Sequence, residues 1–450
     1  MKYKPYPKYK PSGVAWLGDV PEHWEISTVR HQFENLDYRR VPLAGEIRAS
    51  HEKTYAYYGA SGIIDHVEDY LFNEPMILVA EDGANLLSRS TPLAFLATGE
   101  YWVNNHAHIL RPRSGHFGYW VPILQIYDYT PLVTGAAQPK LTAERLHSIK
   151  LPTPPDFEQS AIASFLDVET GRLERLLGKQ RELMERLGEK RRALISRCVT
   201  RGLPPPAAQA AGLHPHPKLK PTGIDWLGEI PEHWAIGVKL KSLSIREPAA
   251  FTNGPFGSDL LTSEIEDEGI PVIYIRDLKA TGYKRASRSH VTEEKARELK
   301  KFRVTAGDVL IAKVGDPPGF GCVYPATEPP GIICQDVIRL RPDRELIDER
   351  YFCNLLNSNA GIAAVDNVSV ELTRKRFSLD DLRSIRLPLP PKAEQTAIAA
   401  YLDTETAKLD GLISKVAEAI ERLTEYRTAL ITAAVTGKID VRKAPYGKSV

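Results

Sequence analysis

Two stretches of the chain place mostly apolar side chains at alternating intervals of four and three residues within an otherwise charged sequence. The first runs from Ile162 to Leu194, and the second from Ile398 to Leu430. This heptad spacing predicts two helices of ~60 Å that each pack lengthwise on another helix, most simply on each other. The leucines predicted to pack are Leu166, Leu173, Leu187, Leu194, Leu402, Leu409, Leu423 and Leu430. The same spacing places Leu176, Leu183, Leu412 and Tyr426 on the seam.

Each predicted helix opens with a pair of prolines. Residues 151–159 (Leu-Pro-Thr-Pro-Pro-Asp-Phe-Glu-Gln) are repeated 236 positions later as Leu-Pro-Leu-Pro-Pro-Lys-Ala-Glu-Gln. Proline is tolerated in the first turn of a helix and not beyond it, so these pairs predict fixed helix starts. Asp156 and Gln159 fit a capping box, which Lys392 breaks in the second copy. Four glycines off the seam indicate either tolerated surface positions or close approach of a partner protein: Gly171, Gly178, Gly188 and Gly411.

A second internal repeat precedes each variable segment. Residues 8–26 and 218–236 are identical at 12 of 19 positions, with an offset of 210, and both contain Trp-Leu-Gly followed by Pro-Glu-His-Trp. We call these repeats the first and second clasps. A metal or catalytic role is conceivable for His23 and His233, but the accompanying tryptophans favour a packed structural unit. If the two halves are arranged alike, the first clasp lies near the end of the second helix and completes a ring with a pseudo-twofold axis.

The segments between clasp and helix share little sequence and alternate turn residues with short apolar runs. Residues 76–79, 271–275 and 308–312 predict buried strands, and 293–301 predicts a helix. A repeated scaffold with two different β-rich heads suits a two-headed binding module better than a single active site. We therefore expect an α+β chain divided into a clasp (1–26), a first head (27–150), a helix (151–203), a linker with the second clasp (204–236), a second head (237–386), and a helix with a tail (387–450).

Composition restricts the class of protein only weakly. At 450 residues, 42% hydrophobic content and a net charge of +2, the chain has room for two or more globular domains, and any basic surface must be local. The four cysteines show no C-x-x-C spacing, which argues against a structural zinc and fits a reducing cytosol. With no signal-like start and no long apolar run, a cytoplasmic location without a membrane span is expected.

A search for catalytic motifs gives little. There is no G-x-x-x-x-G-K-[ST], H-E-x-x-H or G-x-S-x-G sequence, and the paired carboxylates at 81–82 and 380–381 lack a surrounding metal or acid constellation. Asp316-Pro317-Pro318-Gly319-Phe320 resembles the Asp-Pro-Pro-aromatic loop of amino-methyltransferases, but glycine stands at the fourth position and no glycine-rich cofactor loop precedes it. We interpret that segment as a turn that ends a strand, and we expect no catalytic residue and no metal site.

Recognition of DNA is the remaining chemical possibility. Glutamine pairs with adenine and arginine with guanine in the major groove, and basic side chains neutralise phosphates. Polar and aromatic loop residues in both heads are candidates for such contacts, although a structural or solvent-exposed role competes for each. The candidates in the first head are Tyr57, Tyr58, Ser88, Arg89, Ser90, Asn104, Asn105, His106, Gln138 and Lys140. Those in the second head are Phe256, Gly257, Ser258, Arg276, Lys313, Gln335, Arg374, Lys375 and Arg376.

The ordered pair of clasps, the two proline-rich helix openings and the segment 135–141 make the chain resemble the specificity subunit of type I restriction-modification systems over nearly its whole length. The resemblance implies two target-recognition domains held apart by an antiparallel coiled coil, each binding half of a bipartite site in double-stranded DNA. It implies two modification subunits that carry S-adenosylmethionine and methylate adenine. It also implies restriction subunits that use ATP and Mg²⁺, and no catalysis by the specificity chain itself.

Two other classes of protein compete with this interpretation. The first is a coiled-coil adaptor whose heads bind proteins, which would lack salt-dependent affinity for DNA even with a methyltransferase present. The second is a self-contained methyltransferase, which would bind S-adenosylmethionine without a partner. The sequence does not fix the recognised bases or the gap between half-sites, because one glutamine or arginine can face a phosphate as easily as a base.

Overall fold

The chain mixes helices and strands, as expected, and folds into two compact units in a computed structural model. Unit 1 contains Met1–Arg181 and Ala417–Val450, and unit 2 contains Glu182–Val416. The structure describes residues 3–43, 54–135, 138–215, 217–224, 226–370 and 375–442. Each unit holds one head, one clasp and one half of each long helix. No helix in these described ranges is long and apolar enough to cross a membrane.

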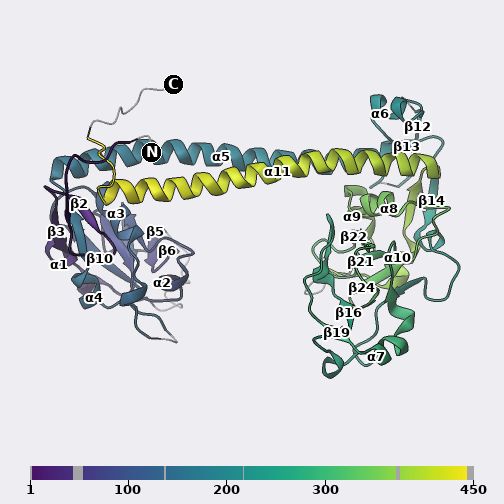
Figure 1. The fold of residues 1–450 in the computed structure, drawn as a ribbon, viewed down its shortest axis with the longest axis horizontal. Coiled ribbons are helices and arrows are strands. Elements are labelled where there is room, and N and C mark those ends of the chain that lie inside the picture. Colours follow the sequence, from purple (N-terminus) through teal and green to yellow (C-terminus); the bar gives the residue numbers. More distant parts are fainter. Residues whose placement is uncertain are drawn as a thin grey trace. The chain divides into compact units, whose positions relative to one another are not determined.

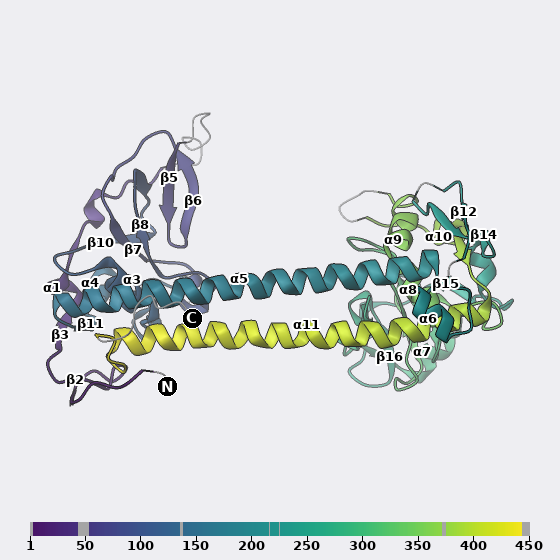
Figure 2. The same cartoon turned by 90° about the horizontal axis from the view of Figure 1, so that it is seen from above.

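The two predicted helices are the longest elements. Helix α5 spans Asp156–Arg201 and helix α11 spans Lys392–Val435. In unit 1, the Tyr119 hydroxyl donates to the carbonyls of Pro152, just before α5, and Val435, at the end of α11, while Glu174 pairs with Arg427 at 2.9 Å. The two segments therefore run antiparallel within this unit, and Figures 1 and 2 both show them side by side.

Unit 2 contains the complementary helix halves. Arg191 pairs with Asp410 at 2.8 Å. The last turns of α5, around Val199, share one apolar core with the first turns of α11, around Ile398. The helix halves in unit 2 therefore also run antiparallel. The eight leucines predicted to pack are all buried or half-buried.

The seam nevertheless departs from strict heptad spacing at two positions in each helix. Leu176 and Leu183 are 38% and 44% exposed, whereas Leu177 is only 5% exposed. In α11, Leu412 and Tyr426 are likewise 47% and 46% exposed. A straight helix has 3.6 residues per turn, so a 3.5-residue repeat drifts by ~20° per heptad. The predicted seam positions at these four residues are therefore wrong. Leu177 takes the buried place next to Leu176, whereas the later heptad leucines Leu187 and Leu194 stay half-buried.

The first head is built on a four-stranded antiparallel sheet in the order β4-β10-β7-β8. The prediction of a buried strand at 76–79 is confirmed, since every residue of β7 is buried. A second sheet, β6-β5-β9, contains a parallel pair, β5 and β9. The strands are β4 (Phe33–Asn35), β5 (Tyr55–Gly59), β6 (Gly62–Val67), β7 (Met76–Ala80), β8 (Ala94–Ala97), β9 (Tyr101–Val103) and β10 (Ala107–Pro112). The helices are α1 (Val29–Gln32), α2 (Asn85–Ser88), α3 (Phe117–Ile126) and α4 (Ala143–Ser148).

The second head repeats this arrangement with the sheet β15-β24-β21-β22. A further sheet, β19-β16-β23-β20, and the pair β17-β18 have different connections from the second sheet of the first head. Its strands are β15 (Phe251–Asn253), β16 (Ile270–Ile273), β17 (Leu278–Lys279), β18 (Gly282–Tyr283), β19 (His290–Val291), β20 (Arg303–Val304), β21 (Val309–Ala312), β22 (Gly321–Val323), β23 (Gly331–Ile333) and β24 (Val337–Leu340). Its helices are α7 (Glu293–Glu298), α8 (Glu349–Leu356), α9 (Asn359–Asp366) and α10 (Leu379–Ser384).

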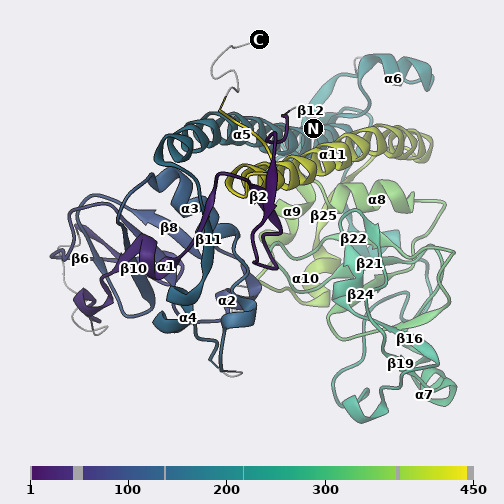
Figure 3. The same cartoon turned by 60° about the vertical axis from the view of Figure 1, so that its left-hand side comes forward.

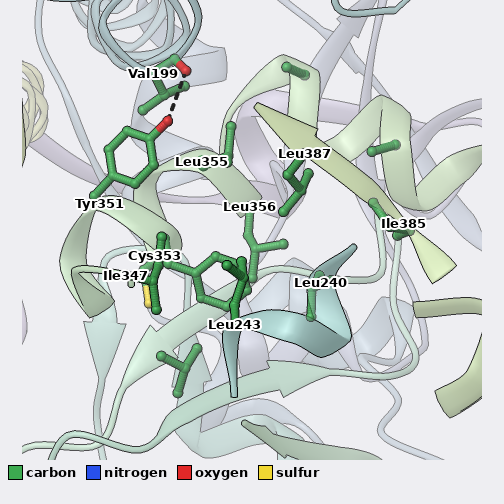
Figure 4. Packing of buried hydrophobic residues seen from close by; sticks show 14 of the residues in the cluster. Val199, Leu240, Leu243, Ile347, Tyr351, Cys353, Leu355, Leu356, Ile385 and Leu387 are labelled. Carbon is green, nitrogen blue, oxygen red and sulfur yellow. Dashed lines mark hydrogen bonds between the residues drawn. The ribbon is translucent and has the colours of Figure 1, made fainter. Parts of the chain in front are cut away.

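Helix α8 joins the second head to the long helices. Its side chains Leu355 and Leu356 pack with Leu243 and Leu387 in one buried cluster (Figure 4). The hydroxyl of Tyr351, which is fully buried, donates to the carbonyl of Val199 in the last turns of α5 at 3.3 Å. A fully buried hydroxyl needs such a partner, so this bond fixes how the head sits on the helix end.

The segment Asp316–Phe320 connects two neighbouring strands. It follows β21 and leads into β22, and the Gly319 amide donates to the carbonyl of Ala312 at 2.8 Å. Gly319 has a φ of +88°, and a Cβ atom there would lie 2.7 Å from side-chain atoms of Val365. Glycine is therefore required at the position where the methyltransferase loop carries another residue, and the segment is the turn that we predicted.

Each clasp contains a small antiparallel pair of strands, and the strand that follows it pairs with the strand just before a long helix. In the first clasp, β1 (Tyr9–Pro11) pairs with β2 (Asp19–Pro21), and β3 (Glu25–Thr28) pairs with β11 (Lys150–Thr153). The second clasp repeats this with β12 (Leu219–Pro221), β13 (Glu229–Pro231), β14 (Ala235–Lys239) and β25 (Arg386–Leu389), and helix α6 (Pro205–Ala210) precedes it.

The first clasp lies against the end of α11, as Figure 3 shows for β2. The hydroxyl of Tyr9 donates to the carbonyl of Gly437 at 3.0 Å, and the Lys438 ammonium donates to the carbonyl of Leu17 at 3.1 Å. The predicted position of this clasp is therefore confirmed.

One glutamate holds the first clasp to the start of α5. Glu158 accepts hydrogen bonds from the Trp24 indole at 2.9 Å and the Tyr6 hydroxyl at 3.0 Å, and its other oxygen lies 2.5 Å from His23 Nε2. In the second clasp, Glu394 lies 2.7 Å from His233 Nε2. These contacts give both histidines a structural role.

The capping box predicted at Asp156 is wrong. The Gln159 side chain instead donates to the Pro154 carbonyl at 3.0 Å and accepts from the His116 amide at 3.3 Å. The side-chain amide of Gln159 is therefore used to link α5 to the segment that precedes α3, and not to cap the helix.

Candidate nucleic-acid interface

Three loops meet at one edge of the main sheet in the first head. The end of β7 lies beside the β9–β10 loop, because the Glu81 amide donates to the His106 carbonyl at 3.0 Å. The third loop, residues 134–140, lies beside the end of β7, because the Gly83 amide donates to the Pro139 carbonyl at 3.0 Å. Lys140 also forms backbone bridges with Asp82 and with Thr134.

The second head assembles three loops in the same way. The Lys313 amide donates to the Asp336 carbonyl at 2.9 Å, and the Gly315 amide donates to the Lys375 carbonyl at 3.3 Å. Arg376 forms backbone bridges with Val314 and with Val370. The bridge between residues 370 and 376 stands 236 positions after the bridge between residues 134 and 140, the same offset that relates the two helices. Each head therefore has what we call a three-loop surface.

The third loop turns tightly in the first head. Gly135 has a φ of +86°, and a Cβ atom at this position would lie 2.4 Å from the carbonyl oxygen of Gln138. Only glycine fits there without a shift of the backbone. The local sequence therefore sets the turn that brings Gln138 and Lys140 to the surface.

Beneath the first three-loop surface lies a network of charged side chains. Arg40 pairs with Glu81, and Lys140 Nζ lies 3.0 Å from the other oxygen of Glu81. Asp37 lies 2.6 Å from His108 Nδ1 and accepts from the Ile109 amide at 2.8 Å. These contacts attach the third loop, through Lys140, to residues of the sheet.

Both carboxylates of this network are held in their charged form. Burial opposes ionisation of Asp37, but its hydrogen bond to His108 and the bond from the Ile109 amide outweigh burial and lower its pKa. Burial likewise opposes ionisation of Glu81, but the hydrogen bonds from Arg40 and Lys140 lower its pKa below the ordinary value. Asp37 and Glu81 are therefore ionised at neutral pH and support the loops electrostatically.

Three residues of the same network are arranged as metal ligands often are. Ligand atoms of Asp37, Glu81 and His108 all lie within 4.8 Å of one another. Arg40 and Lys140 already bind Glu81, and His108 Nε2 lies 2.8 Å from the carbonyl of Leu141. Because cationic side chains already neutralise the carboxylates, we interpret the group as a structural ion-pair network.

The β9–β10 loop presents polar side chains next to this network. Asn104 is 3% exposed and accepts the His106 amide at 2.8 Å, so it shapes the loop. His106 Nδ1 lies 2.8 Å from Asp82, while Asn105 and Gln138 are exposed. The structure thus brings Asn104, Asn105, His106, Gln138 and Lys140 together.

Other candidates of the first head have local structural contacts. Tyr57 is 2% exposed, and Tyr58 stacks on Phe95 with burial raising its pKa. The exposed Arg89 donates to the carbonyls of Gln125 and Tyr127. Ser88 and Ser90 are exposed and lie within a hydrogen bond of each other beside α2, and Ser90 also donates to Asn85. The Tyr58 carbonyl accepts the Asn104 amide at 3.0 Å and so joins β5 to the three-loop surface, whereas the contacts given for Ser88, Arg89 and Ser90 lie elsewhere in the described part of the head.

In the second head the three-loop surface is hollowed. A cavity of about 370 Å³ is lined by three of the predicted residues, Lys313, Gln335 and Arg376, together with Asp336 and Asp381. Gln335 and Arg376 are exposed. Basic, amide and carboxylate groups therefore line one concave site, which suits hydrogen bonding to the donors and acceptors of base edges.

The remaining candidates of the second head are more dispersed. Phe256 is 63% exposed, and Gly257 and Ser258 are exposed beside it. Their loop begins at Gly254, whose amide donates to the Val337 carbonyl next to the three-loop surface at 3.0 Å. Arg276 donates to Ser287 at 2.7 Å and lies over the Tyr274 ring. Lys375 pairs with Asp366 at 2.7 Å, and Arg374 lies outside the described residues.

The sequence did not reveal Arg40, Asp82 and Asp336 as residues of these surfaces. Arg40 is far from the loops along the chain and reaches them through Glu81, so no local motif marks it. One signal was present: the 236-residue offset extends from the helices back to the third loops.

Comparison with known proteins agrees with this architecture. Residues 21–182 and 257–422 match the family described as type I restriction modification DNA specificity domain. A putative type I restriction enzyme specificity subunit of Haemophilus influenzae is 33% identical over 134 residues, 29% of this chain and 33% of that relative. The MjaVIII specificity subunit of Methanocaldococcus jannaschii is 24% identical over 312 residues, 68% of this chain and 66% of the relative.

A solved structure extends the likeness to the fold. It comes from work on the complex assembly and conformational transition of the type I R-M system. It superposes with a TM-score of 0.61 at 16% identity, covering 93% of this chain and 99% of that one. Two family matches that together cover most of the chain place it firmly: this chain belongs to the type I restriction modification DNA specificity family.

Proposed function

We propose that the chain is the DNA-recognition subunit of a type I restriction-modification complex, in which each three-loop surface binds one half of a bipartite DNA site. The observation that carries the proposal is the same loop assembly in two heads with different side chains. Because one scaffold carries two different polar surfaces, each head is able to recognise its own base sequence. Amide, imidazole and basic groups at these edges match the donors and acceptors of the major groove.

The long helices act in this proposal as the spacer between the half-sites. They form an antiparallel coiled coil, and the matching clasps close the chain into a ring with a pseudo-twofold axis. Half-sites one helical turn apart are ~34–36 Å between centres, a distance that helices of this length can span. The separation of the two adenines to be methylated is then set by helix length.

Partner subunits carry out the chemistry. Two modification subunits bring S-adenosylmethionine and methylate one adenine in each half-site, and restriction subunits use ATP and Mg²⁺ for translocation and cleavage. This chain supplies recognition and no catalytic group. Its nearly neutral net charge suits a subunit whose partners share the contacts to the DNA backbone.

The test is to express the chain together with the neighbouring methyltransferase gene and to sequence adenine methylation across the host DNA. We expect one split motif with a methylated adenine in each half and a fixed gap. Substitution of Gln335 or Arg376 by alanine should relax or change bases in one half of the motif and leave the other half unchanged. A complex that assembles but methylates no motif contradicts the proposal and favours a protein-binding adaptor.

A further inference from the structure

A second hollow in the second head is more basic than the three-loop surface. Its volume is about 460 Å³, and it lies between β14, the segment 241–251 and α10. Lys239, Lys241 and Arg246 line it, and all three are exposed. None of the three forms an ion pair with any described residue of the chain. Uncompensated cations around one concavity favour the binding of an anion.

The other charged groups of the hollow already have partners. Glu247, the acidic residue of the lining, lies 3.8 Å from Arg341, which also pairs with Asp308. Arg383 Nη1 lies 3.1 Å from Asp380, and Nη2 donates to the carbonyl of Phe251. Arg383 Nε is buried and makes no hydrogen bond within the described part of the chain. The exposed cations Lys239, Lys241 and Arg246 are therefore the charges of the hollow that have no ion-pair partner within the described part of the chain.

The hollow is joined to the three-loop surface by α10. The N-terminal part of this helix, at Ser378 and Asp381, lines the cavity of the three-loop surface. Arg383, in its last turn, lines the basic hollow. Six helical residues rise by ~9 Å, so the two sites are neighbours. Duplex DNA carries one phosphate charge per ~1.7 Å of its axis, and a duplex bound at the first site therefore has phosphates within reach of the second.

We propose that the basic hollow binds the phosphodiester backbone of the DNA flanking the half-site that the second head recognises. This inference rests on the proposed function and adds a contact that is independent of base sequence. Lys239, Lys241 and Arg246 neutralise phosphates, and Arg383 closes the inner side of the hollow. Such contacts strengthen binding to every sequence equally and fix the orientation of the duplex.

The experiment uses the complex with its modification subunits and two fluorescent duplexes, one with the methylated motif and one with the motif scrambled. The variant K239Q/K241Q/R246Q is compared with R297Q/K300Q/R303Q, which removes three exposed charges from another hollow of the same head. Affinity is measured by anisotropy over a range of salt concentrations. Circular dichroism and gel filtration of each variant show whether the fold and the complex are retained.

We expect the first variant to bind both duplexes at least tenfold more weakly at physiological salt. Its slope of log affinity against log salt should fall by about 2 to 3, since each lost phosphate contact removes ~0.9. The methylated motif should stay the same, and the control variant should keep the wild-type slope.

Three results would overturn the inference: an unchanged slope, an equal loss in the control, or loss of the modification subunits from the first variant. The last would assign the hollow to an acidic segment of a partner protein. If the wild-type complex does not distinguish the two duplexes, the proposed function itself fails. A wild type that does distinguish them, with an unaffected hollow variant, refutes only the phosphate contact.

Discussion

Glu158 and Glu394 occupy equivalent places at the start of the two long helices, but the structure gives them different partners. Glu158 binds side chains of Trp24, Tyr6 and His23, whereas the hydrogen bond shown for Glu394 is to His233. Trp234, the counterpart of Trp24, is buried with an indole nitrogen that has no hydrogen-bond partner among the described residues. The two clasps therefore allow the same glutamate to be compared with different hydrogen-bond partners.

We predict that Glu158→Gln weakens the first clasp more than Glu394→Gln weakens the second. The first change removes the charge from an acceptor shared by three side chains, which costs on the order of 1–3 kcal/mol. Hydrogen exchange of peptides covering 19–28 and 229–238 measures each clasp separately. Equal increases in exchange in the two variants would contradict the prediction.

A second prediction concerns acid and the network under the first three-loop surface. The pKa values of Asp37 and Glu81 are lowered in the folded state, so the unfolded chain binds protons more readily. Their contribution to the free energy of unfolding is therefore complete above the ordinary carboxyl pKa values and is lost as the pH falls through the folded-state values.

Glu81→Gln tests this link, because it removes one of the two titrating groups. We expect the first head to be less stable by about 1–3 kcal/mol at pH 7, since Arg40 and Lys140 lose an anionic partner. Its stability should also fall less steeply between pH 5 and pH 3 than that of the wild type. Urea unfolding followed at several pH values provides the measurement, and parallel pH curves would show that Glu81 is not the coupled group.

At the scale of the elements, two adjacent leucines of α5 differ in burial at the helix seam. Leu177 is 5% exposed, while Leu176, the heptad position, is 38% exposed. We expect Leu177→Ala to lower the free energy of unfolding of unit 1 by about 2 kcal/mol or more, and Leu176→Ala to cost less than half as much. The two variants delete the same atoms one residue apart, so each is the control for the other. A larger loss of stability in Leu176→Ala than in Leu177→Ala, measured by chemical unfolding, would contradict the prediction and support strict heptad packing.

The elements themselves followed closely from local sequence. The strand at 76–79 and the helix starts after the proline pairs were predicted where they occur, because burial and proline stereochemistry act locally. The helix predicted at 293–301 is divided into α7 and a short 3₁₀ turn at Lys300–Phe302. The parallel pairing of β5 with β9 left no local signal, since strand partners are chosen by long-range packing.

At the scale of the whole chain, the proposed function makes helix length the measure of the DNA gap. Removal of seven residues from both helices, 179–185 and 416–422, keeps the same helix faces in register and shortens each by ~10 Å. We expect the motif to keep both half-sites while its gap shrinks by about three base pairs. Methylation sequencing gives the gap directly, and co-purification of the modification subunits shows that the complex still forms. An unchanged gap would show that helix length does not set the spacing between the half-sites.

Two patterns in the sequence by itself determined the plan of this protein. The 236-residue and 210-residue offsets showed two helices, two clasps and two unlike heads, because a repeated scaffold needs repeated apolar and proline positions. They also predicted that the first clasp lies at the end of α11, which the contacts of Tyr9 and Lys438 confirm.

Only the tertiary structure decided which candidate residues share a surface. It brought Lys313, Gln335 and Arg376 to one cavity, held Tyr57 inside the first head, and recruited Arg40 from a distant part of the chain. It also moved the helix seam from Leu176 to Leu177. Residue type and spacing describe what a side chain is able to bind. The pairing of strands and the drift of a straight helix determine where that side chain points.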